Sequence, residues 1–243
     1  MKEHIYTIPV IDGFNAGGEC PFCNMYHKLD TDAVEYMLGA SYMEDDIRME
    51  TDKKGFCREH YKKMFAMQNR LGLSLMLHTH LKKINSELEA TYKNMAYTGK
   101  RSFFFQNSEP QENKVASLVN GFTQNCYICD RSENSFKQYL ETFFYLWKND
   151  SEIIDMVKNG NGFCLEHFSV LISTAEKKLN ATEFKNFCEI IIPKQMEILK
   201  ALEGDLDWFI QKFDYRFSDE PWKNSKDALP RGIQKIASIN DLV

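Results

Sequence analysis

Two segments of the chain carry the same pattern: Gly55-Phe56-Cys57-Arg58-Glu59-His60 and Gly162-Phe163-Cys164-Leu165-Glu166-His167. In each, a Cys-x-x-His motif follows a glycine–phenylalanine pair, and a glutamate precedes the histidine. A Cys-x-x-Cys motif precedes each of these cysteines, with 33 or 34 residues in between: Cys20-Pro21-Phe22-Cys23 and Cys126-Tyr127-Ile128-Cys129. The matching spacing predicts that the chain is built from two copies of one unit.

The similarity between the copies extends upstream of the cysteines. Val10-Ile11-Asp12-Gly13-Phe14 precedes the first Cys-x-x-Cys motif, and Leu118-Val119-Asn120-Gly121-Phe122 precedes the second. The copies are offset by 106 residues at the Cys-x-x-Cys motifs and by 107 at the Cys-x-x-His motifs. Because six of the seven cysteines fall into this register, we interpret the pattern as an internal duplication.

The composition indicates a globular helical protein. Hydrophobic residues make up 43% and charged residues 27% of the 243 residues, and the chain has few glycines and prolines, 12 and 6. We therefore expect an all-α fold of two duplicated helical modules, each with a Cys3His metal site, that form a helical bundle. Along the chain we expect a first module (1–96), a linker (97–112), a second module (113–214) and a C-terminal tail that packs on the bundle (215–243).

Local signals predict the individual helices. Thr31 or Asp32 could cap a helix ending near Tyr42, with Asp32 and Glu35 resembling a capping box, and a long helix is expected after Cys57. Asn180 with Glu183 predicts another helix start, and Pro193 should kink or interrupt that helix. The other predicted elements are short helices at 45–51, 135–146, 152–157, 164–179 and 230–239, a short extended arm at 5–10, and a contact of Trp222 that anchors the tail.

The two motif types together provide the ligands of a structural zinc site. A Cys-x-x-Cys motif places two sulfurs close enough to bind one ion, and Cys-x-x-His at a helix start adds a sulfur and an imidazole one turn apart. Gly55 and Gly162 would allow the turn that presents the ligand cysteine of each helix. We expect each copy to close its own site, with two structural zinc ions in all: Cys20, Cys23, Cys57 and His60 in the first, and Cys126, Cys129, Cys164 and His167 in the second.

Two other interpretations of the cysteines stay open. An iron–sulfur cluster is less favoured, although three cysteines and one histidine can also hold iron. Cys20-Pro21-Phe22-Cys23 alone resembles a glutaredoxin-type redox motif. That motif needs a preceding strand in a βαβ pattern, and it leaves the Cys-x-x-His motif unexplained.

The remaining cysteine, histidines and glutamates have simpler expected roles. Cys188 is expected to be a small core residue. The histidines outside the motifs have no matching partners and are not expected to be ligands: His4, His27, His78 and His80. Glu59 and Glu166 lie beside the proposed histidine ligands, where an acid suits a first helical turn and a catalytic base is the less favoured role.

Charge and hydrophobicity limit the partners. A net charge of −5 and a pI of about 5.7 make nucleic acid an unfavourable partner. The sequence shows no signal peptide and no apolar run long enough to span a membrane, so we expect a cytoplasmic protein whose cysteines are thiolates or metal ligands. A protein partner is compatible with this composition.

The doubled motif resembles a known family. Tandem Cys-x-x-Cys and Gly-Phe-Cys-x-x-His motifs, with Glu220-Pro221-Trp222 and the segment from Ala228 to Arg231 in the tail, are similar to an uncharacterised bacterial family known as a domain of unknown function. The resemblance covers Val10 to about Ile236. It implies a bacterial cytoplasmic protein and supplies no activity.

Three functions follow from these expectations. The first is a noncatalytic binding or scaffold protein with structural zinc, which the closed ligand sets favour. The second is a thiol-based redox or metal sensor that releases zinc on oxidation. The third is an enzyme that uses a cleft between the modules, for which the sequence names no substrate.

Overall fold

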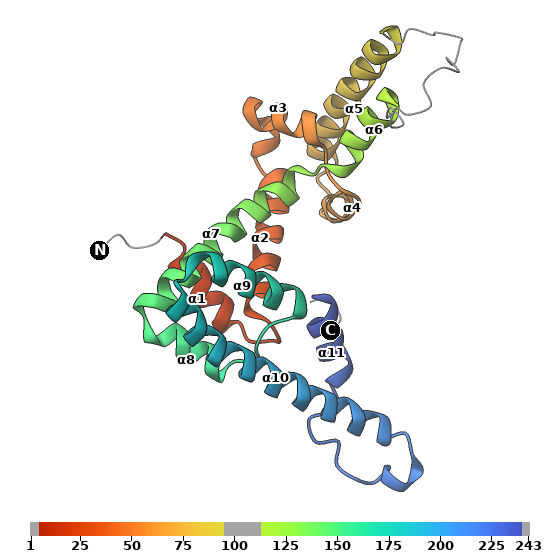
Figure 1. The fold of residues 1–243 in the computed structure, drawn as a ribbon. Coiled ribbons are helices and arrows are strands. Elements are labelled where there is room, and N and C mark those ends of the chain that lie inside the picture. Colours follow the sequence, from red (N-terminus) through yellow and green to blue (C-terminus); the bar gives the residue numbers. More distant parts are fainter. Residues whose placement is uncertain (1–4, 95–112, 240–243) are drawn as a thin grey trace, which may run out of the picture. The chain divides into compact units, whose positions relative to one another are not determined.

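The computed structural model describes residues 5–94 and 113–239, and all regular structure in these ranges is helical (Figure 1). The expected all-α fold is therefore confirmed for this part of the chain, and the expected linker at 97–112 lies outside it. The elements are α1 (Thr7–Asn15), α2 (Pro21–Leu38), η1 (Ser41–Met43), α3 (Asp45–Lys54), α4 (Arg58–Ala66), α5 (Arg70–Lys93), α6 (Lys114–Gln124), α7 (Tyr127–Asn149), α8 (Ser151–Asn159), α9 (Leu165–Lys178), α10 (Ala181–Gln211), η2 (Tyr215–Phe217) and α11 (Ala228–Ala237).

The helix order repeats with the sequence. Helices α1 to α5 and α6 to α10 follow one scheme: a short helix, a long helix that begins in the Cys-x-x-Cys motif, a short helix, a helix that begins in the Cys-x-x-His motif, and a long final helix. Helix α11 follows the second copy and has no counterpart after the first among the described residues.

The helix that follows each Cys-x-x-Cys motif starts earlier than predicted. Helix α2 begins at Pro21, where proline suits the first helical position because it has no amide hydrogen to leave unpaired. Asp32 therefore lies in the middle of α2, and the predicted start there was wrong. The extended arm predicted at 5–10 was also wrong, because Val10 is buried in a helix, and Phe14, one turn later, packs against the same core.

Two predictions about the long helices had different outcomes. The single helix expected after Cys57 is two helices, because α4 ends before Gln68, whose φ is 65°, and Asn69 starts α5 by accepting from the backbone of Gly72. The capping box at Asn180 and Glu183 is confirmed. Pro193 does not interrupt α10, since it lies on an exposed face where the carbonyl it leaves unpaired can reach solvent.

The described residues form two compact units. Unit 1 combines the chain up to Leu29 with the chain from Asn134 onward, and unit 2 comprises Asp30–Glu133. Both boundaries fall inside a helix, one in α2 and one in α7. Each unit thus combines the start of one copy with the end of the other, and neither coincides with the contiguous modules expected at 1–96 and 113–214.

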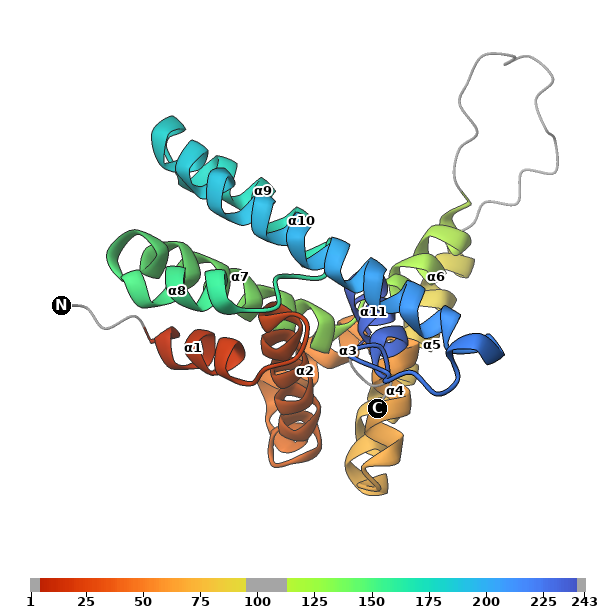
Figure 2. The same ribbon diagram turned by 90° about the horizontal axis from the view of Figure 1, so that it is seen from below.

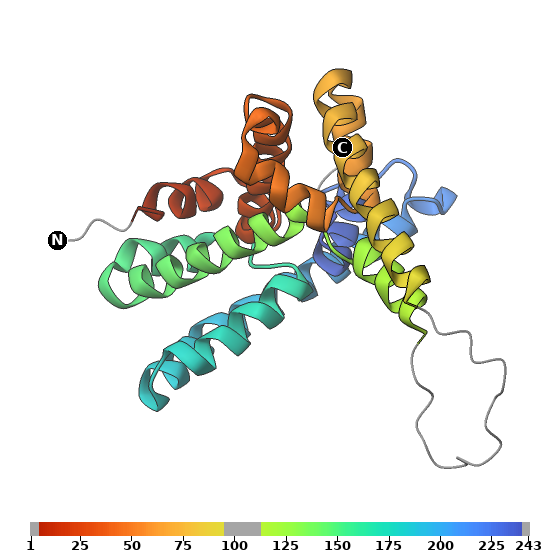
Figure 3. The ribbon, with the colours of Figure 1, turned by 90° about the horizontal axis from the view of Figure 1, so that it is seen from above.

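Each unit has its own core. In unit 1, α9 and α10 lie side by side (Figure 2), and the core is rich in aromatic residues such as Phe22, Phe143 and Phe187. In unit 2, α5 and α6 lie side by side (Figure 3), and the core is rich in methionines such as Met37 and Met64.

The tail packs on α10 as predicted. The ring of Trp222 lies 5.9 Å from that of Phe209, measured between centroids. The amine of Lys212 donates to the carbonyls of Phe217, Ser218 and Glu220. Helix α11 then contacts both α9 and α10.

Among the described helices, none combines the length with the hydrophobicity that crossing a membrane requires.

Candidate metal centres

The eight predicted ligands gather into two groups, in each of which the potential ligand atoms all lie within 4.8 Å of one another. Quartet A consists of Cys20, Cys23, Cys164 and His167, and quartet B of Cys57, His60, Cys126 and Cys129. Each Cys-x-x-Cys motif thus meets the Cys-x-x-His motif of the other copy.

The predicted closure of a site within each copy was therefore wrong, and the length of the helices explains why. Helix α2 has 18 residues, which carry the chain about 27 Å from the motif at its start. The 10-residue helix α3 is too short to return the chain over that distance. An outgoing helix that began at Asp32, as predicted, would have been short enough for the chain to return.

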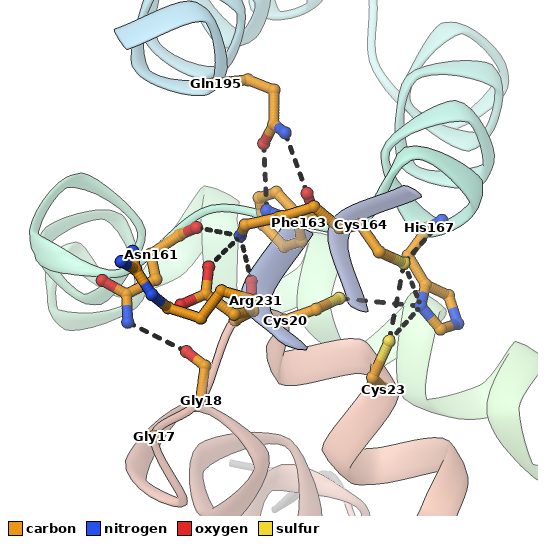
Figure 4. Close-up of polar contacts among 12 residues, drawn as sticks. Gly17, Gly18, Cys20, Cys23, Asn161, Phe163, Cys164, His167, Gln195 and Arg231 are labelled. Atoms are coloured by element: carbon orange, nitrogen blue, oxygen red, sulfur yellow. Dashed lines mark hydrogen bonds and ion pairs between the residues drawn. The ribbon is translucent and has the colours of Figure 1, made fainter. Parts of the chain in front are cut away.

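Quartet A is held by the starts of α2 and α9, in unit 1. Cys164 is the N-cap of α9, and the backbone amide of His167 donates to its sulfur over 3.4 Å. Nδ1 of His167 faces all three sulfurs, at 3.1 Å from Cys164, 3.3 Å from Cys23 and 3.6 Å from Cys20 (Figure 4). The sulfurs of Cys23 and Cys164 are 3.5 Å apart.

The loop before Cys164 is fixed by α10. Gly162 has φ of 72°, which favours glycine, and a Cβ there would lie 2.7 Å from Oε1 of Gln195. Gln195 accepts from the backbone amide of Phe163 and donates to its carbonyl, at 2.9 and 2.8 Å (Figure 4). The turn predicted at Gly162 is thus confirmed, and Gln195 holds it in place.

Helix α11 closes quartet A from another side. The hydroxyl of Ser238 donates to the sulfur of Cys164 over 3.1 Å. Lys235 is fully buried, and its amine donates to the carbonyls of Glu19 and Asn161, which lie just before the two ligand motifs. The same amine lies 3.2 Å from the Glu19 carboxylate. Lys235 therefore ties together the two loops that carry the quartet.

Quartet B has the same ligand geometry in unit 2, at the starts of α4 and α7. Nδ1 of His60 lies 3.2 Å from the sulfurs of Cys57 and Cys126 and 3.5 Å from that of Cys129. The sulfurs of Cys57 and Cys129 are 3.8 Å apart. The backbone amide of Cys129 donates to Cys126 over 3.5 Å, as expected for a turn that supports a thiolate.

The turn at Gly55 is also confirmed. Gly55 has φ of 61°, and a Cβ there would lie 2.5 Å from the ring of His80. That ring is fixed by a hydrogen bond of 2.7 Å between its Nδ1 and the carbonyl of Asp52. His80 is thus a buried support of the loop, in the role that Gln195 has in unit 1.

The histidine of quartet B is oriented by a carboxylate. Nε2 of His60 lies 2.6 Å from Oδ1 of the buried Asp30, whose other oxygen lies 2.6 Å from the amine of Lys63. With Asp30 as acceptor, Nε2 carries a hydrogen, so that loss of the second ring proton would leave the lone pair of Nδ1 facing the sulfurs. Carboxylates behind metal-binding histidines have this effect in many metal sites.

A phenylalanine takes this place at quartet A. Asp30 follows Cys23 by seven residues, and Phe136 follows Cys129 by seven, so the two positions correspond in the duplication. The ring of Phe136 lies 5.2 Å from that of His167, centroid to centroid. One helical position therefore contacts the ligand histidine in both units, through a carboxylate in one and a phenyl ring in the other.

The protonation of the quartets without metal follows from this geometry. Burial by itself would lower the pKa of His60, but hydrogen bonds with Asp30 and Cys126 raise it to about 10. Burial raises the pKa of Cys126, but the hydrogen bond with His60, together with the backbone amides of Cys129 and Cys57, outweighs burial and lowers it to about 6. Burial by itself would also lower the pKa of His167, but hydrogen bonds with Cys164 and Cys20 raise it to about 9. A bound metal must displace the Nδ1 proton in both quartets.

Asp30 stays ionised beside quartet B. Burial raises the pKa of this carboxyl, but hydrogen bonds from His60 and Lys63 outweigh burial and lower it to about 2. The carboxylate therefore remains an acceptor for His60 down to strongly acidic pH.

The residues not expected to be ligands lie outside both quartets. Cys188 packs against the core of unit 1 but is only partly buried, so the predicted buried core position is met in part. Neither His27 nor His78 belongs to a quartet, and His4 lies outside the described residues. Glu59 and Glu166 are exposed, and Glu59 pairs with Lys62 at 2.9 Å.

Sequence reasoning missed the residues that support the quartets: Asp30, His80, Gln195, Lys235 and Ser238. One signal was available, because the copy offset of 106 aligns Asp30 with Phe136 two turns beyond each Cys-x-x-Cys motif. Nothing in the sequence indicates that Lys235, 71 residues after Cys164, would reach the same centre.

Fold and sites together define an all-α protein with two Cys3His-type groups, each of which could hold a metal ion. The chain belongs to a family described as "Family of unknown function (DUF6062)", whose profile matches residues 1–242. This confirms the resemblance to a family of unknown function that the tandem motifs predicted. No curated protein and no solved structure matches the chain.

Proposed function

We propose that this protein binds two structural zinc ions, one in each quartet, and acts as a noncatalytic binding or scaffold protein. The observation that carries the proposal is the convergence of three sulfurs and one imidazole nitrogen, twice, within 4.8 Å. A shared ion explains why four such groups lie so near one another, and Cys3His is a known structural zinc set.

The distances fit a tetrahedral ion. With Zn–S near 2.3 Å and Zn–N near 2.0–2.1 Å, a tetrahedron has sulfur–sulfur edges of about 3.8 Å and sulfur–nitrogen edges of about 3.6 Å. One sulfur–sulfur distance in each quartet is 3.5 or 3.8 Å, the other potential ligand atoms lie within 4.8 Å of one another, and the sulfur–nitrogen distances run from 3.1 to 3.6 Å. Zinc has no electronic preference for another geometry, which supports it over other single ions.

The same compactness argues against an iron–sulfur cluster. In a cluster the ligands bind different iron atoms, which spreads the ligand atoms over more than one coordination sphere. In each quartet the four ligand atoms are close enough to share one ion.

A structural role is supported by the closed ligand sets. Four protein ligands fill the tetrahedral positions, so no position is left for a water or a substrate. Glu59, which follows the ligand Cys57 by two residues, is exposed and paired with Lys62, away from any position where it could serve as a base.

Metal content of paired variants tests this proposal. The full-length chain should contain two zinc ions by elemental analysis. Cys20→Ser combined with Cys164→Ser disrupts quartet A alone and should leave one ion, whereas Cys20→Ser with Cys57→Ser disrupts both quartets and should leave none. Sites closed within each copy would give the opposite result, none and one.

Cys188→Ser is the matched control, because Cys188 lies outside both quartets, and it should retain two zinc ions. Structural zinc contributes folding free energy, so a chelator should lower the melting temperature. A chain that contains iron, that contains no metal, or that melts at the same temperature with and without chelator would contradict the proposal.

A further inference from the structure

The two quartets differ in how far solvent reaches their sulfurs. In quartet A the cysteines are closed off, with exposed fractions of 0% for Cys20, 3% for Cys23 and 0% for Cys164. Of the three cysteines in quartet B, Cys126 is buried, and Cys57 and Cys129 are partly exposed.

The difference has a structural cause. Helix α11 follows the second copy and places Ser238 on the sulfur of Cys164 and Lys235 against the loops around quartet A. Within unit 2 the described residues include no helix equivalent to α11. The sulfurs of Cys57 and Cys129 therefore lack this cover.

The two exposed sulfurs are also neighbours, 3.8 Å apart. A metal-bound thiolate that a reagent can reach is open to oxidation, and a second thiolate beside it can resolve the product as a disulfide. Quartet B offers such a pair, and in quartet A no thiolate is comparably exposed.

We infer that quartet B is a peroxide-responsive site that releases its zinc ion, while quartet A releases its ion much more slowly. Hydrogen peroxide oxidises the Cys57 thiolate to the sulfenic acid, and the O–O bond breaks with formation of one water. The Cys129 thiolate then attacks the Cys57 sulfur, the S–S bond forms, and the sulfenic oxygen leaves as a second water. Two thiolates, one peroxide and two protons thus give one disulfide and two waters, and the zinc ion leaves as Zn²⁺ because two of its ligands are gone.

The inference rests on the proposed zinc binding, and one experiment separates the two. The zinc-loaded full-length chain is treated with one equivalent of hydrogen peroxide, and the released zinc is followed with a colorimetric indicator. We expect one of the two zinc ions to leave about ten-fold faster than the other, or more. Peptide mass spectrometry should then find a Cys57–Cys129 disulfide and unmodified Cys20, Cys23 and Cys164, and a thiol reductant with added zinc should restore two ions.

Two variants sharpen the result. Cys188→Ser should release zinc like the parent chain, because Cys188 is no ligand. Cys57→Ser should lose the fast phase and keep the slow one. If Cys57→Ser does not fold, the disulfide map of the parent chain still decides the matter.

Two zinc ions released at the same rate, or oxidation found first in quartet A, would overturn this inference and leave the proposed function intact. A chain that binds no zinc at all would remove both.

Discussion

Quartets A and B have the same ligands, the same Nδ1 contact and equivalent helix starts, yet they lie in different surroundings. Quartet A is surrounded by aromatic rings and covered by α11, with a buried lysine across its loops. Quartet B has an ionised carboxylate behind its histidine and two partly exposed sulfurs. The comparison shows the same arrangement of sulfur and nitrogen atoms at equivalent helix starts in both units, with different side chains around it.

The largest expected effect concerns the residue in the middle of each Cys-x-x-Cys motif. Phe22 is fully buried among the rings of Phe136, Phe143 and Phe163, and its counterpart Ile128 is fully buried in unit 2. Phe22→Ala should destabilise the fold by about 3–5 kcal/mol and Ile128→Val by about 0.5–1.5 kcal/mol, in proportion to the volume removed. Urea unfolding followed by circular dichroism measures both. Equal losses would mean that the aromatic core is not what distinguishes unit 1.

The second effect should be confined to quartet A. Lys235→Met leaves the buried Glu19 carboxylate without its cation and should cost about 3 kcal/mol, since breaking a buried pair exposes an uncompensated charge to the protein interior. Lys54→Met is the matched control, because the Lys54–Asp130 pair is partly exposed and should contribute about 0.2–1 kcal/mol. Thermal unfolding of the two variants compares them, and a Lys235→Met chain as stable as the control would show that α11 does not stabilise the centre.

The third effect should be confined to quartet B. Asp30→Asn keeps the size of the side chain but removes the negative charge behind His60, and the zinc affinity of this quartet should fall about 10–100-fold. Competition with a chelator of known affinity resolves the two ions. Phe136→Leu alters the corresponding position at quartet A and should leave quartet B unchanged. An Asp30→Asn chain that binds both ions normally would show that the carboxylate has no influence on the metal.

The smallest effect concerns the two glycine turns. Gly55→Ala and Gly162→Ala both place a Cβ at positive φ, which costs about 1–2 kcal/mol. Gly55→Ala should be the more damaging, because the Cβ would lie 2.5 Å from the anchored ring of His80, whereas at Gly162 the nearest atom, Oε1 of the unbranched Gln195 side chain, lies 2.7 Å away. Gly204→Ala, in an open and helical position, should instead stabilise the protein slightly. The order of the three melting temperatures tests this difference.

Local chemistry made much of the fold predictable. The capping box at Asn180 and the glycine turns before Cys57 and Cys164 depend on neighbouring residues, and the structure confirms them. The start of α2 was misplaced because Asp32 with Glu35 imitates a cap, although Pro21 was the better signal. This wrong prediction concerns the end of a helix, and helix ends depend on packing as well as on sequence.

The identity of the candidate ligands was predictable, but their grouping was not. The spacing of 33 or 34 residues between motifs is compatible with closure inside a copy or between copies, since both use the same eight side chains. The choice depends on how far α2 and α7 extend before the chain turns, which is a property of the packed structure. The supporting residues Asp30 and Lys235 were missed because their roles arise only from that packing.

The boundary of the two units inside α2 and α7 has a consequence for how the chain is constructed. One repeat alone contributes half of each quartet and completes neither. Two identical single-repeat chains would therefore have to associate, each supplying one motif to each site, to build one pair of sites. The present chain corresponds to such a dimer with its two subunits joined into one polypeptide. Cleavage of the chain between residues 95 and 112 would therefore yield two fragments that stay associated, because each fragment needs the other to complete a candidate metal-binding quartet.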